Sequence, residues 1–160
     1  MALLLCASLP ASSTSISVSV RVPFDPPVAD FVFFYGTLMA GFDRRRRAGI
    51  DTKLTYRGRG SIRASLFDLG IYPAAIPASE GVVWGEVYEM ADQEAVLAAL
   101  DDIEGYRTDD PDKSLYARSK ADVTMPDGTT EQAWVYFYNA PLGKAPRIAS
   151  GDYLEHTKVR

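Results

Sequence analysis

The strongest constraint on the fold is a pair of alternating segments, Leu115–Val123 and Glu131–Tyr138, joined by a short polar connection. That connection contains Asp127-Gly128. Asp-Gly is favoured in tight hairpin turns, whose central residues need positive φ. Successive side chains of an extended chain point to opposite faces, so each segment fits a strand with one covered face. The sequence therefore predicts an antiparallel hairpin, and with it a fold built on β-sheet.

Other segments also have the character of strands or of the loops between them. Apolar runs or alternating patterns predict strands at Phe31–Phe34, Leu54–Tyr56, Ile62–Phe67 and Val82–Glu89. Two glycines separate the second of these from the third. Glycine and proline after the third predict an irregular loop over Asp68–Ser79.

One segment, Gln93–Glu104, is predicted to be an α-helix. Asp92 suits the N-cap, and Gly105 is a typical C-terminal stop. Apolar residues recur along one helical face at Val96, Leu97, Leu100 and Ile103. Many short strands with one clear helix indicate an α+β domain, either a curled, mostly antiparallel sheet or a small β-barrel flanked by helix.

Composition limits the chemistry that such a domain can perform. The chain of 160 residues has one cysteine, Cys6, and one histidine, His156. An internal disulfide is therefore impossible, and no cluster of histidine, cysteine and carboxylate is spaced as a zinc site requires. We expect no metal and no cofactor, and a chemistry that uses carboxylates, hydroxyls and backbone amides.

The N-terminal segment, residues 1–29, differs from the rest in being rich in apolar residues, serine and proline. We expect a poorly ordered extension before a single domain over residues 30–160. An organelle transit peptide is the alternative, although Arg21 is the only basic residue of the segment. No apolar run reaches the length of a membrane span, about 18 residues. We expect a cytoplasmic protein without membrane association.

Charge is unevenly distributed around a net value of −4. A basic stretch at residues 44–63 includes four consecutive arginines, Arg44–Arg47. It lacks the interleaved aromatic residues that stack on nucleic-acid bases, and the sequence pI of about 5.0 is low. We interpret the stretch as a solvated loop or short helix, and expect no nucleic-acid partner.

Two features could bind or transform a small molecule. Tyr35-Gly36-Thr37-Leu38 follows a predicted buried strand, and successive free amides at such a turn can bind a carboxylate or an oxyanion. The alternative is an ordinary turn.

Glu104 is the second feature, because it ends the helix beside Asp101. The helix dipole and the neighbouring charge both favour its protonated form, which would suit a proton shuttle. The alternative is an acidic helix end without a role. Tyr116 and Tyr136 lie on strand faces that could direct their hydroxyls into a pocket, although ordinary aromatic packing explains each equally well.

Six short motifs follow one another along the chain: Phe-Tyr-Gly-Thr-Leu at 34–38, Leu-Gly-Ile-Tyr-Pro at 69–73, Trp-Gly-Glu-Val-Tyr at 84–88, Leu-Asp-Asp-Ile-Glu-Gly-Tyr at 100–106, Leu-Tyr-Ala-Arg at 115–118 and Trp-Val-Tyr-Phe-Tyr at 134–138. In these motifs and their order, the chain resembles the short branch of the gamma-glutamylcyclotransferase-like family over residues 31–156.

This resemblance implies a small, mostly antiparallel β-barrel with flanking α-helices. It also implies that the turn of Tyr35, Gly36, Thr37 and Leu38 binds the glutamyl part of a small-molecule substrate, with Glu104 as the catalytic carboxylate and Tyr116 nearby. The implied reaction is attack of the substrate α-amine on its own γ-carbonyl, releasing 5-oxoproline and an amine. A non-catalytic ligand-binding or regulatory module on the same fold is the alternative. The leaving amine and the oligomeric state stay open.

Overall fold

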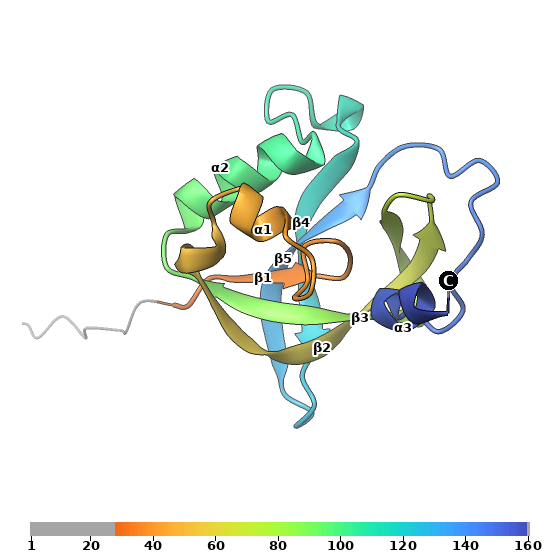
Figure 1. Cartoon of the computed structure of the whole chain (residues 1–160), viewed down its shortest axis with the longest axis horizontal. Helices are drawn as coiled ribbons and strands as arrows, with labels where there is room; N and C mark the ends of the chain where they lie inside the picture. Colours follow the sequence, from red (N-terminus) through yellow and green to blue (C-terminus); the bar gives the residue numbers. More distant parts are fainter. Residues whose placement is uncertain (1–27, 160) are drawn as a thin grey trace, which may run out of the picture.

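Five strands form a closed barrel in the computed structural model, which describes residues 28–159 (Figure 1). The strands are β1 (Phe31–Phe34), β2 (Leu54–Asp68), β3 (Pro73–Met90), β4 (Tyr116–Thr124) and β5 (Thr130–Tyr138). Around the barrel their order is β1-β3-β2-β4-β5. Neighbouring strands are antiparallel except for β1 and β5, which close the barrel as a parallel pair. The predicted α+β barrel, mostly antiparallel and with flanking helices, is confirmed.

The predicted hairpin is the β4–β5 pair, whose register runs from Tyr116 opposite Tyr138 to Thr124 opposite Thr130. Met125 and Gly128 close its turn, with the Gly128 N–H donating to the Met125 carbonyl at 2.9 Å. The hairpin predicted from the sequence therefore forms one side of the barrel.

The strands β2 and β3 are longer than the sequence predicts. Gly58 and Gly60 lie inside one continuous β2, and the shift in register between Tyr56 and Gly58 absorbs the irregularity. The irregular loop expected over Asp68–Ser79 is also wrong, because β3 begins at Pro73 and pairs with β2 from there. A proline is tolerated at a bulge or strand end, where no ladder donor is required.

Helix α2 (Gln93–Glu104) has the predicted bounds. The Asp92 side chain accepts a hydrogen bond from the Ala95 N–H, and Gly105 ends the helix in the left-handed region with φ 65°. Val96, Leu97 and Leu100 are buried. The remaining helical segments are short: α1 (Arg44–Arg47), η1 (Asp51–Lys53), η2 (Pro111–Lys113) and α3 (Tyr153–Lys158).

The barrel core consists of valines and larger apolar residues from every strand. Val32, Val83, Val87, Val123 and Val135 are completely buried, and Phe33 and Leu66 nearly so. β-branched residues suit this position because they pack well on a pleated surface. The core explains the apolar runs of the sequence and holds the strand ends in fixed positions.

The C-terminal segment lies beside the end of β2, near the tip of the β2–β3 hairpin (Figure 1). The Ile148 N–H donates to the Leu66 carbonyl at 2.8 Å, and the Asp68 N–H donates to the Pro146 carbonyl at 2.9 Å. No helix in the described part of the chain is long and apolar enough to cross a bilayer. The predicted N-terminal extension lies, except for its last two residues, outside the described residues.

Candidate active site

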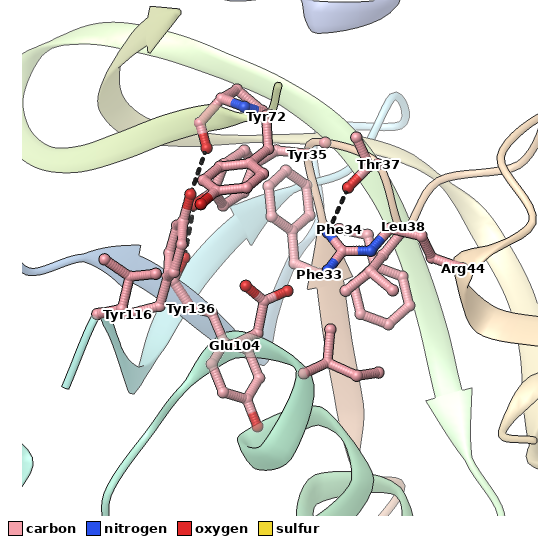
Figure 2. Close-up of a pocket in the computed structure, with 14 residues that line it drawn as sticks. Phe33, Phe34, Tyr35, Thr37, Leu38, Arg44, Tyr72, Glu104, Tyr116 and Tyr136 are labelled. Atoms are coloured by element: carbon pink, nitrogen blue, oxygen red, sulfur yellow. Dashed lines mark hydrogen bonds between the residues drawn. The ribbon is translucent and has the colours of Figure 1, made fainter. Parts of the chain in front are cut away.

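One pocket opens between the end of β1, the turn after it, the C-terminal end of α2 and the start of β4 (Figure 2). It encloses about 570 Å³, including adjoining solvent. The seven residues singled out from the sequence all contribute to its lining: Tyr35, Gly36, Thr37, Leu38, Glu104, Tyr116 and Tyr136. Segments distant in sequence therefore meet at one concave site, while the roles of these residues stay predictions.

The turn after β1 lines the pocket and contains backbone amides without an acceptor. The Met39 N–H closes the turn onto the Gly36 carbonyl at 3.0 Å, and the Ala40 N–H donates to the buried Glu86 carboxylate at 2.9 Å. By contrast, the amides of Gly36, Thr37 and Leu38 have no acceptor among residues 28–159. A run of N–H groups of this kind suits a carboxylate or an oxyanion.

Glu104 directs its carboxylate from the last turn of α2 into the pocket, between Tyr116 and the strand β1 (Figure 2). Burial raises the pKa of this carboxyl from its ordinary value of 4.5 to about 7, and the positive charge of Arg44 offsets part of that effect. Removing a carboxylate from water penalises its charged form, so the group exchanges a proton near neutral pH. That property is what a general acid–base group requires.

The cause of this pKa differs from the one expected from the sequence. Asp101, predicted to repel Glu104, instead makes an ion pair with Arg118 at 3.0 Å. Its Oδ1 also accepts a hydrogen bond from the Tyr136 hydroxyl at 2.6 Å. The charge of Asp101 is therefore compensated locally, and burial in the pocket is the cause that perturbs Glu104.

Three tyrosines form one wall of the pocket, but their hydroxyls have different surroundings. Tyr35 donates to the Tyr136 carbonyl at 2.6 Å, and Tyr116 donates to the Pro73 carbonyl at 2.8 Å. The Tyr136 hydroxyl is bound to Asp101 of α2, although the residue lines the pocket, so its contact with a substrate stays a prediction.

Burial raises the pKa of all three tyrosine hydroxyls above the ordinary value. These groups consequently stay protonated at neutral pH and can donate hydrogen bonds, but they cannot serve as bases. Among the described residues that line the pocket, Glu104 is the one whose pKa lies near neutrality. No three His, Cys, Asp or Glu side chains gather as a metal site would need anywhere in residues 28–159.

Two polar residues of the lining escaped the sequence reasoning. Tyr72 packs edge-on against Tyr116, with ring centroids 6.2 Å apart. Arg44 reaches into the pocket and donates from Nη1 to the Thr37 hydroxyl at 2.7 Å. Arg44 belongs to the stretch interpreted as solvated, and no local signal in the sequence distinguishes it from the three arginines that follow.

Comparison with known proteins agrees with the geometry. The family model described as gamma-glutamyl cyclotransferase, AIG2-like, matches residues 32–155. A gamma-glutamylcyclotransferase family protein, YtfP, of Citrobacter rodentium is 34% identical over 125 residues, which cover 78% of this chain and 95% of the relative.

Two solved structures share the fold. An AIG2-like protein of Mus musculus has a TM-score of 0.61 and 27% identity, covering 78% of this chain and 88% of the mouse chain. YkqA of Bacillus subtilis also has a TM-score of 0.61 at 24% identity, but this chain spans only 42% of its length. The family model spans most of the barrel and the whole candidate site. This chain therefore belongs to the AIG2-like gamma-glutamyl cyclotransferase family.

Proposed function

We propose that the protein is an enzyme that cyclises γ-glutamyl compounds, releasing 5-oxoproline and an amine without a metal or cofactor. The observation that carries this proposal is the meeting of Glu104, with its pKa near 7, and three free amides at one pocket. A γ-glutamyl compound contains both the nucleophile, its α-amine, and the electrophile, its γ-carbonyl. The protein has to hold the folded conformer, because good orientation alone is worth about 7–11 kcal/mol. It also has to move protons from the attacking nitrogen to the departing one.

Glu104 would transfer these protons. The α-ammonium of the substrate cannot attack while it is charged, so the Glu104 carboxylate takes one of its protons. The free amine then forms a bond to the γ-carbon, giving a five-membered tetrahedral intermediate whose ring nitrogen carries two hydrogens and a positive charge. As the bond from this carbon to the departing nitrogen breaks, the protonated Glu104 gives its proton to that nitrogen. The restored carboxylate then takes the second proton of the ring nitrogen, which leaves the neutral lactam, and passes it to the released amine or to water.

Hydrogen-bond donors near Glu104 would stabilise the negative oxygen of the intermediate. The amides of Gly36, Thr37 and Leu38 exceed what one carboxylate oxygen needs, so the turn can serve both the glutamyl carboxylate and the oxyanion. The Tyr116 hydroxyl, now bound to Pro73, would exchange that acceptor for the oxyanion. The backbone amides are fixed before the reaction, so they need no reorganisation when charge develops.

The test is release of 5-oxoproline from γ-glutamyl compounds that differ only in the leaving amine: an amino acid, a peptide, a lysine side chain and a polyamine. Release from at least one of them, measured by chromatography or NMR, is expected. It should fall by about 10²–10⁴-fold in Glu104→Gln. It should be kept in Asp102→Asn, which removes an equal charge from an exposed neighbour on α2. Binding of these compounds without any release would instead support the non-catalytic module.

A further inference from the structure

The pocket contains a positive charge that the cyclisation scheme does not use. Helix α1 consists of four arginines, of which Arg45 pairs with Asp51 at 3.5 Å and Arg47 pairs with Asp43 at 2.7 Å. Arg44 instead turns toward the pocket and lines it. Figure 2 shows its guanidinium beside Thr37, across the pocket from Tyr116.

This guanidinium has no counter-ion in the described part of the chain, where no carboxylate lies within ion-pairing distance of Arg44. Its field nevertheless acts on the site, because it lowers the pKa of the Glu104 carboxyl and of the Tyr116 hydroxyl against the larger effect of burial. A partly buried cation without a counter-ion binds an anionic group of a ligand more strongly than a solvent-exposed cation does.

The arrangement of charges matches the head of a glutamyl group. Arg44 and Glu104, both within the described residues, affect each other electrostatically but do not form an ion pair. An α-amino acid carries an ammonium and a carboxylate on one carbon. A site that binds both groups needs a carboxylate for the ammonium and a cation for the carboxylate, close together but not paired with each other. The Thr37 hydroxyl takes one guanidinium N–H, and the remaining donors of the fork are free for a carboxylate.

We propose that Arg44 binds the α-carboxylate of the γ-glutamyl substrate, together with the amides of Gly36, Thr37 and Leu38. Arg44 thereby makes the site selective for ligands that keep this carboxylate. The proposal rests on the proposed function, since it names how the same pocket reads its substrate. It places the ammonium of the substrate on the Glu104 side, where the proton has to be removed.

The test is a binding measurement that requires no turnover. 5-Oxoproline carries the carboxylate, and pyrrolidin-2-one is the same ring without it. Calorimetry or NMR titration should show that the parent protein binds 5-oxoproline and binds pyrrolidin-2-one much more weakly. Arg44→Gln should weaken 5-oxoproline by about 10- to 100-fold, the usual value of a hydrogen-bonded charge pair. It should leave pyrrolidin-2-one unchanged.

Arg46→Gln is the matched control, because Arg46 is exposed on the same short helix and loses the same charge. An equal loss in both variants would overturn the proposal in favour of a general effect of net charge, and unchanged binding in Arg44→Gln would overturn it outright. If Arg44→Gln does not fold, Arg44→Lys keeps the charge and loses the fork. Binding of 5-oxoproline by Arg44→Lys at the parent affinity would then count against the proposal.

Turnover separates the proposal from failure of the proposed function. If no γ-glutamyl compound releases 5-oxoproline but Arg44 still controls its binding, catalysis is refuted and the carboxylate assignment stands. If the enzyme is active, Arg44→Gln should raise KM equally for γ-glutamyl compounds with charged and uncharged leaving amines. A penalty confined to leaving amines that carry a carboxylate would show that Arg44 reads the other half of the substrate, contrary to the proposal.

Discussion

Replacing Glu104 by glutamine should separate catalysis from stability in one variant. Glutamine keeps the size and hydrogen-bonding shape of the side chain but cannot exchange a proton. If Glu104 is the base, turnover should fall by about 10²–10⁴-fold, the usual contribution of general acid–base catalysis. Binding of 5-oxoproline should survive, because the amides of Gly36, Thr37 and Leu38 are backbone groups.

The same change should stabilise the fold, by an amount that depends on pH. A carboxyl pKa raised from 4.5 to about 7 means that the folded state holds its proton more tightly than the unfolded state does. Its contribution to stability is fully present below pH 4.5 and declines until the pH passes 7. At about 1.36 kcal/mol for each pH unit, the cost of the ionised Glu104 reaches about 3 kcal/mol above pH 7 as an upper value.

Urea unfolding of the parent and of Glu104→Gln at pH 5, 6, 7 and 8 measures this difference. The gain in free energy of unfolding should grow from pH 5 to pH 7 and then level off, whereas Asp102→Asn should show no such growth. The reasoning is refuted by a gain that does not depend on pH, or by a Glu104→Gln variant that releases 5-oxoproline near the parent rate.

Three further outcomes are expected. The kcat/KM of the parent should rise with pH through about 7, because Glu104 must lose its proton to act as base, and a flat profile from pH 6 to 8 would contradict that role. Tyr116→Phe removes the hydroxyl bonded to Pro73 at 2.8 Å and should lower the free energy of unfolding in urea by about 1 kcal/mol. If this hydroxyl serves the oxyanion, kcat should also fall by about 100-fold. An unchanged kcat would show that the hydroxyl has only a structural role. Gly36→Ala would place a Cβ 2.7 Å from the Pro73 ring, so the turn or the ring must move; we expect a raised KM and a loss of about 1–3 kcal/mol, and parent-like kinetics would argue against a substrate-binding turn.

The predictable elements were those with strong local signals. Helix α2 has the predicted bounds because Asp92, the apolar stripe and Gly105 act within a few residues of one another. The β4–β5 hairpin was equally visible, because its turn and its alternation are local. In contrast, the continuity of β2 through Gly58 and Gly60 depends on pairing with β3, which no short window of sequence contains.

The candidate site also combined features visible in the sequence with features that depend on tertiary contacts. Motif resemblance identified the residues, and the fold placed them around one pocket. The cause of the raised Glu104 pKa was misjudged, because neighbours along the helix suggested repulsion by Asp101 while the tertiary partner Arg118 neutralises it. Arg44 was missed for a related reason: four identical arginines look alike in sequence, and only the fold distinguishes the one that lines the pocket.

The position of Glu104 depends on contacts that lie behind the pocket. Arg118 of β4 lies over the rings of Tyr106 and Trp134, at 5.2 and 5.0 Å from their centroids, while its Nε reaches Asp101 of α2. The Tyr136 hydroxyl of β5 binds the same carboxylate. These contacts fasten the C-terminal end of α2 to two strands of the barrel. Proton transfer requires heavy atoms within hydrogen-bonding reach, so a helix end that moved freely could not serve it. An ion pair that looks like ordinary structural support thus helps to hold in place the helix end that carries Glu104.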